Sequence, residues 1–163
     1  MATVFPVRRF LTNAGSMNMA VNGSVTPVAF NMTVAANELF SVDELILCMT
    51  GTGTIAQPLT EFWDFPLLTN GISTDLKLGT TTQTLTGILK TNFDLIQFIG
   101  ADFLGKVIGT RNVVRGVIEF KTPLTFNGAR GDFYRITIRD NLTNGGKIEN
   151  MTICLRGTMV TKP

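Results

Sequence analysis

The chain has 163 residues, a length that corresponds to one domain. Its 14 Lys and Arg residues against 12 Asp and Glu residues leave a net charge of +2, so we expect no specific nucleic acid as a partner. The sequence contains no His and only two Cys, which excludes histidine-based catalytic triads and four-ligand zinc sites. We therefore predict a protein that is not an enzyme and has no cofactor and no metal.

The composition favours an all-β protein with covered surfaces. The chain contains 24 Thr, 12 Asn and 16 Gly residues, which are typical of strands and tight turns. Charged residues make up only 16% of the chain, against about 25% in an average globular domain. A surface with so few charges suits a protein whose faces are covered by copies of itself or by another partner. The longest apolar runs are a few residues, such as Leu45–Met49, so no membrane partner is expected.

The first residues predict an extended arm. Pro6 and the Arg8-Arg9 pair interrupt the alternation of apolar and polar residues, and Asn13-Ala14-Gly15-Ser16 has the chemistry of a loop. We expect an N-terminal arm over residues 1–16 that packs on a neighbouring subunit, and a β-sandwich domain over residues 17–163. Removal of the arm is expected to weaken assembly and to leave the fold intact.

The middle of the chain predicts several strands. Met17 to Val21 is compatible with a first short strand. Val28 to Val34 alternates clearly, the continuous apolar run Leu45–Met49 fits a central strand, and Ile72 to Leu78 alternates strictly. Thr80 to Leu89 can form a further Thr-rich strand. Asn92 to Ile99 is the one segment in which a short helix is expected, because Asn92 can cap it.

The last third again predicts strands. Val114 to Phe120 alternates, and Leu124 and Phe126 form a short run before a flexible tip at Asn127–Gly131. Tyr134, Ile136 and Ile138 are predicted to face inward, as are Met151, Ile153 and Leu155 on the final strand. The sequence thus indicates about eight or nine strands and almost no helix. This pattern is typical of an antiparallel β-sandwich of the jelly-roll or Greek-key type.

Two motifs suggest ligand chemistry. Gly51-Thr-Gly53-Thr-Ile-Ala56 matches a dinucleotide-binding fingerprint, but Pro58 prevents the helix that must follow it, so a loop is the better interpretation. Trp63 lies in the same loop as Glu61 and Asp64, which is the basis for the alternative of a carbohydrate-binding module. The opposing interpretation is a loop whose Trp is anchored in a neighbour or in the core.

Several residues are candidates for an interface. Arg135 and Arg139 are an even number of positions apart and are expected on one side of a strand, where they form a weak basic stripe with Arg130. Such a stripe fits an acidic partner surface, or it is a solvated sheet face. The candidate interface residues are Phe5, Arg8, Arg9, Phe10, Trp63, Arg130, Arg135 and Arg139.

Four segments resemble a family of small virion proteins from tailed bacteriophages. These segments are Val21–Val28, Leu68–Ile72, Lys90–Asn92 and Arg139–Thr143, and the resemblance extends from Val21 to Gly157. The motifs are turns and the starts of strands. The chain has Arg139-Asp140-Asn141 where the family pattern has two adjacent acids, so no ion site is carried over.

The resemblance implies a non-enzymatic component of a phage particle, which is assembled in the host cytoplasm and is present in many copies. The most favoured role is a capsid decoration, or cement, protein that forms a homo-oligomer and contacts the major capsid protein. A component of a neck, collar or tail ring, beside neighbouring head–tail proteins, is the alternative within the same class. The carbohydrate-binding module remains the alternative from a different class.

Overall fold

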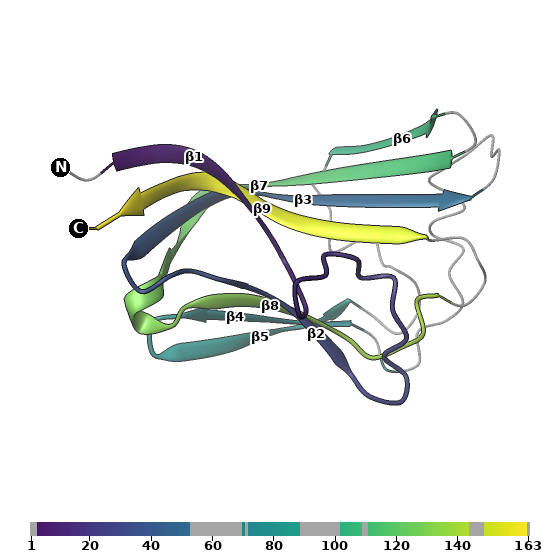
Figure 1. Cartoon of the computed structure of the whole chain (residues 1–163), viewed down its shortest axis with the longest axis horizontal. Helices are drawn as coiled ribbons and strands as arrows, with labels where there is room; N and C mark the ends of the chain where they lie inside the picture. The colour runs from purple at the N-terminus through teal and green to yellow at the C-terminus, as the bar shows by residue number, and fades with distance from the viewer. Residues whose placement is uncertain are drawn as a thin grey trace.

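The chain folds as an antiparallel β-sandwich, in agreement with the sequence prediction. The computed structural model describes residues 3–52, 70, 72–88, 102–108, 111–143 and 149–162. Over these residues the strands form two sheets that lie face to face (Figure 1). One sheet has five strands and the other has four.

The five-stranded sheet forms the upper layer in Figure 1. Its strands, in spatial order, are β1 (Thr3–Phe10), β9 (Asn150–Thr161), β3 (Glu38–Thr52), β7 (Arg111–Asn127) and β6 (Asp102–Ile108). The ladders that join these neighbours are all antiparallel. Because β9 lies between β1 and β3, the first and the last described strands are adjacent, with Thr3 opposite Thr161 (Figure 1).

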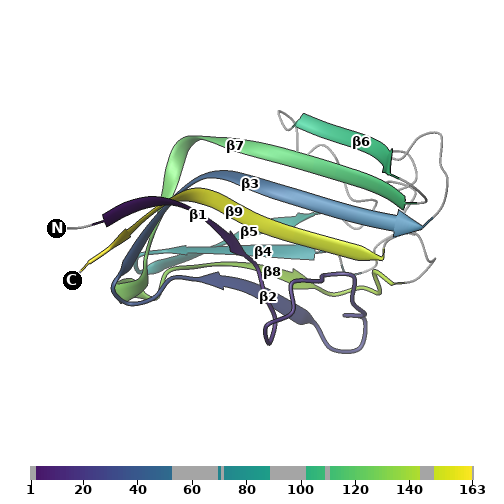
Figure 2. The ribbon, with the colours of Figure 1, turned by 45° about the horizontal axis from the view of Figure 1, so that its top comes forward.

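The four-stranded sheet forms the lower layer, and Figure 2 shows the two layers from a tilted view. Its strands, in spatial order, are β2 (Val28–Thr33), β8 (Phe133–Ile138), β4 (Ile72–Leu78) and β5 (Thr81–Ile88). A single 3₁₀ turn, η2 (Gly128–Arg130), leads from β7 in one sheet into β8 in the other. It lies in the tip that the sequence predicted at Asn127–Gly131.

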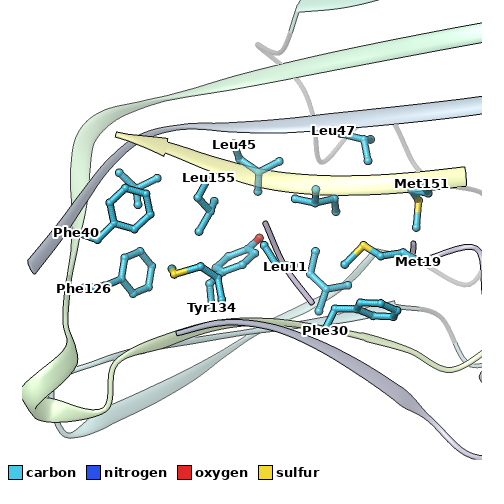
Figure 3. Packing of buried hydrophobic residues seen from close by; sticks show 14 of the residues in the cluster. Leu11, Met19, Phe30, Phe40, Leu45, Leu47, Phe126, Tyr134, Met151 and Leu155 are labelled. Atoms are coloured by element: carbon cyan, nitrogen blue, oxygen red, sulfur yellow. The ribbon is translucent and has the colours of Figure 1, made fainter. Parts of the chain in front are cut away.

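The core lies between the two sheets and is apolar (Figure 3). Period-two alternation turns every second side chain of β2, β8 and β9 inward, as predicted from the sequence. The largest fully buried side chains are Phe30, Phe40, Phe126, Leu11, Met19, Met32, Leu47, Met49, Ile138 and Leu142. Burial also raises the pKa of Tyr134 to about 12, since the phenolate form is desolvated there.

A β-bulge in β3 determines which of its side chains face outward. The register of β3 shifts between Val42 and Glu44 in its ladders with both β7 and β9. Val42 and Leu45 are three positions apart and both lie in the core, which Asp43, the extra residue of β3 relative to β9, permits. Beyond the bulge, Glu44 and Ile46 occupy the outer face. Gly157 borders the bulge, where an added Cβ would lie 1.8 Å from the Ser41 carbonyl oxygen.

The predicted N-terminal arm is not confirmed as a separate segment. Thr3–Phe10 form the edge strand β1, which pairs along its length with β9 of the same chain. Leu11 follows with no exposed surface and is part of the core. Pro6 is tolerated because an edge strand leaves some of its amides outside the ladder. Residues 3–11 therefore belong to the sandwich, and their removal is expected to disturb the fold.

Two further predicted elements differ from the structure, and two predicted segments lie outside the described residues. Met17 to Val21 form no strand, although Met19 is fully buried and its amide donates to the Met151 carbonyl oxygen at 2.8 Å. The run Leu124–Phe126 is the end of the long strand β7 rather than a separate element. The helix expected at Asn92–Ile99 and the loop with Trp63 lie outside the described residues.

The substitution Leu11→Ala tests whether the N-terminal segment is part of the core. Because Leu11 is fully buried, its truncation is expected to lower the free energy of unfolding by about 2–5 kcal/mol. Val4 is 63% exposed on the preceding strand, so Val4→Ala should change it by only about 0.5 kcal/mol. Urea denaturation measures both values. Equal, small effects would mean that the segment contributes nothing to the core.

Candidate functional site

A groove lies where the end of β1 and the loop after it meet β2. It has a volume of about 360 Å³ and is bounded by the end of β1, the following loop and β2. Two apolar side chains in it reach solvent, since Phe10 is 41% exposed and Met17 is 43% exposed. The lining residues are Arg8, Arg9, Phe10, Thr12, Gly15, Met17, Asn31, Met32 and Thr33.

Backbone hydrogen bonds hold the loop that forms one wall of the groove. Thr12 and Asn31 exchange N–H···O bonds of 2.9 Å in both directions, and Asn13 and Ser16 do so at 2.9 and 2.8 Å. Between Asn13 and Ser16, Ala14 and Gly15 have φ of 46° and 84°, the combination that a type I′ turn requires. This tight turn fixes the position from which Met17 enters the groove.

The basic side chains of β1 have different partners. The Arg9 guanidinium donates to both carboxylate oxygens of Glu38, at 3.0 and 3.1 Å, and Glu38 also accepts from the Ala35 amide. Both bonds come from the Nη2 nitrogen, so they form one charge-assisted contact that engages the positive charge of Arg9. Arg8 is exposed and has no ion pair within the described residues. The groove therefore joins exposed apolar groups to an available positive charge.

The predicted basic stripe is distributed over three separate places. The Arg135 Nε–H donates to Asn31 Oδ1 at 2.7 Å, and its guanidinium carbon lies 4.6 Å from the centre of the Phe133 ring. Arg139 follows the end of β8 and is exposed. Arg130 lies in η2 and pairs with Asp132 at 2.7 Å. Only Arg135, through Asn31, is connected to the groove.

The groove brings together three of the predicted interface residues. Arg8, Arg9 and Phe10 line it, whereas Phe5 is 38% exposed and lies opposite Met159 in the β1–β9 ladder. Trp63 lies outside the described residues, so its role stays a prediction. Sequence reasoning missed Met17 and Asn31. The turn signal at residues 13–16 was the available clue, because a tight turn there carries the next apolar residue to the surface.

The Cys154 thiol is poorly suited to act as a nucleophile. Cys154 is buried, and desolvation together with the nearby Cys48 raises the pKa of its thiol, which disfavours the nucleophilic thiolate. Within the described ranges, no group of three or more His, Cys, Asp or Glu side chains could hold a metal ion. The same ranges contain no helix long and apolar enough to cross a membrane. Comparisons with protein-family models, curated proteins and solved structures found no match to this chain.

Asp132 fixes the tip that carries Arg130. Its carboxylate accepts from the backbone amides of Gly79 and Asn127, both at 2.8 Å, and from Arg130. Burial by itself raises the pKa of Asp132, but these donors outweigh it and hold the pKa below the ordinary 3.8. Because the folded-state pKa is depressed, the stabilisation is fully present above the unfolded-state pKa and is lost as the pH falls through the lower folded value.

The substitution Asp132→Asn is expected to lower the free energy of unfolding by about 2–3 kcal/mol at pH 7, because the new amide places donors against donors. This difference from the wild type should shrink as the pH falls below 3.8, where the wild-type carboxylate also becomes protonated. Urea midpoints measured across this range test it. Asp43→Asn, at an exposed carboxylate, is the control, and a difference that does not vary with pH would contradict the assignment.

Proposed function

We propose that the chain is a non-enzymatic structural protein of a tailed-phage virion, and that it acts as a capsid decoration protein that stabilises the head by burying interfaces. The observation that carries this proposal is the groove beside β1. It combines exposed Phe10 and Met17 with the available charge of Arg8, and it has the chemistry of a contact surface. The low content of charged residues and the resemblance to small virion proteins point in the same direction.

We further infer that the sandwich is a jelly roll. If β6 is set aside, the orders β1-β9-β3-β7 and β2-β8-β4-β5 match the two interlocking Greek keys of that topology. Jelly rolls occur in viral capsid domains and also in lectins. A fold by itself assigns no function, so this topology is compatible with the proposal and the groove remains its basis.

The groove suits a neighbouring subunit that offers an apolar side chain and a carboxylate. Phe10 and Met17 would bury apolar surface against that side chain, and Arg8 would pair with the carboxylate at the rim. A well-packed aromatic anchor contributes a few kcal/mol. Many copies on one particle multiply such a modest contact through avidity, so each single interface can remain weak. On the head, the major capsid protein is the proposed neighbour.

The number of copies per particle tests this function. We expect purified virions of the phage that encodes the chain to contain it in a large number, comparable to that of the major capsid protein, when measured by quantitative mass spectrometry. Particles made without it should assemble but lose their DNA at a lower temperature. A small copy number that fits one ring would favour the neck, collar or tail alternative instead, and complete absence from virions would refute the proposal.

A substitution in the groove tests the contact surface itself. Met17→Asp places a carboxylate among the apolar contacts and is expected to reduce binding to particles that lack the protein by at least about tenfold, the effect of one lost anchor. Val25→Asp makes the same change at a 91% exposed apolar residue outside the groove lining and should bind normally. Sedimentation with the particles measures both. Equal binding of the two variants would assign the contact to another surface.

A further inference from the structure

One row of charges crosses the outer face of the five-stranded sheet. The ladders place Arg8 of β1 opposite Arg156 of β9, Arg156 opposite Glu44 of β3, and Glu44 opposite Glu119 of β7. We call these four residues the charge row. Read across the sheet, the row carries two positive charges followed by two negative charges.

The side chains of the charge row point away from the core. Their neighbours along the strands, Leu155, Leu45 and Ile118, pack into the core, and alternation directs the charge row to the opposite face. Arg156 and Glu44 form an ion pair in the middle of the row. Since the described part of the chain provides no ion pair for Arg8 or Glu119, the two ends of the row are uncompensated and exposed.

The arrangement is unfavourable for an isolated subunit. Each end of the row stands directly opposite a like charge, Arg8 beside Arg156 and Glu119 beside Glu44. Like charges directly opposite one another on a sheet are destabilising. Opposite charges supplied by a partner would relieve the repulsion at each end of the row. Because one end is positive and the other negative, only a partner that carries charges of both signs can relieve both ends.

An apolar row runs beside the charge row on the same face. The ladders align Phe10 with Cys154, Cys154 with Ile46, and Ile46 with Val117. Ile46 and Cys154 are buried although they lie outside the main core cluster, whereas Phe10 at the edge is 41% exposed. Of this row, Phe10 and the half-buried Val117 offer apolar surface next to the charges, which an interface needs because ion pairs alone contribute little.

We propose that this face binds a second copy of the chain, as a two-fold symmetric dimer whose axis lies between β9 and β3 and runs parallel to the strands. Such an axis places β1 of one copy over β7 of the other, so Arg8 meets Glu119 of the second copy, and the reverse contact forms as well. Phe10 of each copy then faces Val117 of the other. A two-fold interface must be self-complementary, and the order of the charge row satisfies that requirement.

The charge row also selects among the possible geometries. An in-plane axis perpendicular to the strands would place β1 over β1 and bring Arg8 against Arg8, which is repulsive. The dimer deepens the proposed function by naming one neighbour, and it rests on that function only for its role on the particle. The groove and the dimer face share Arg8 and Phe10, so a copy bound through one surface competes for these residues with the other. Met17 belongs to the groove alone and Glu119 to the dimer face alone, so variants of these two residues distinguish the surfaces.

Charge reversal tests the dimer in solution without any particle. We expect the wild type to sediment as a dimer whose dissociation constant rises with salt concentration. Arg8→Glu and Glu119→Arg each create two like-charge contacts and should weaken dimerisation at least tenfold. An equimolar mixture of the two variants should restore it, because both contacts in the mixed dimer then join opposite charges. Arg139→Glu, an exposed arginine outside the row, is the control. Thermal unfolding of every variant shows whether it is folded.

Three results would overturn the inference: a wild type that is monomeric at every concentration, a dimer that neither reversal weakens, or two weakened variants that fail to associate when mixed. These results are distinct from the copy number on the virion. A monomer that is abundant on particles would refute the dimer and leave the proposed function in place. A dimer that is absent from particles would support the dimer and refute the proposed function.

Discussion

The packing of two apolar sheet faces against each other is the interaction on which the rest of the structure depends. A strand can maintain this contact only if apolar side chains occupy every position that faces the other sheet. In β3 the bulge at Val42–Glu44 turns Glu44 outward and Leu45 inward, so that the apolar side chains beyond it face the core. Because the inward positions are fixed in this way, the outward positions are fixed as well. The groove and the charge row both follow from that division of side chains.

β1 contributes to both surfaces because Arg8 and Phe10, which alternate with residues that face the core, lie on the outer face and also line the groove. Val7 packs against the core cluster and Leu11, just after the strand, is part of it, while Arg8 and Phe10 belong to the outer face. The same strand end also forms a wall of the groove. A short segment that seemed separate from the domain in sequence is therefore the element that joins the core, the groove and the outer face.

Much of the fold could be predicted from sequence because most strands have one buried face. The alternation at Tyr134, Ile136 and Ile138 reflects such a face directly, and the structure confirms it. The edge strand β1 was missed because Pro6 and the adjacent arginines break the pattern, and an edge tolerates what a central strand does not. β6 was missed as well, since Gly105 lies in the middle of a short, weakly patterned run.

The candidate site was predictable only in part. Arg8, Arg9 and Phe10 could be predicted as interface residues because two charges and an aromatic side chain are adjacent in the sequence. Met17 and Asn31 join them through a tight turn and through the pairing of Thr12 with Asn31, and neither contact leaves a periodic signal. The charge row could not be anticipated at all, because it depends on the register of four strands that are distant in sequence.

The central position of β9 has a consequence for how the chain acquires its structure. β1 and β3 have no direct pairing and are joined only through β9, which is the last described strand to leave the ribosome. Contacts of such large sequence separation slow folding. During that interval, β1 and the facing edge of β3 are unpaired templates for aggregation. Pro6 and the two arginines after it are features that discourage pairing between the wrong edges, so they protect the nascent chain until its own partner strand arrives.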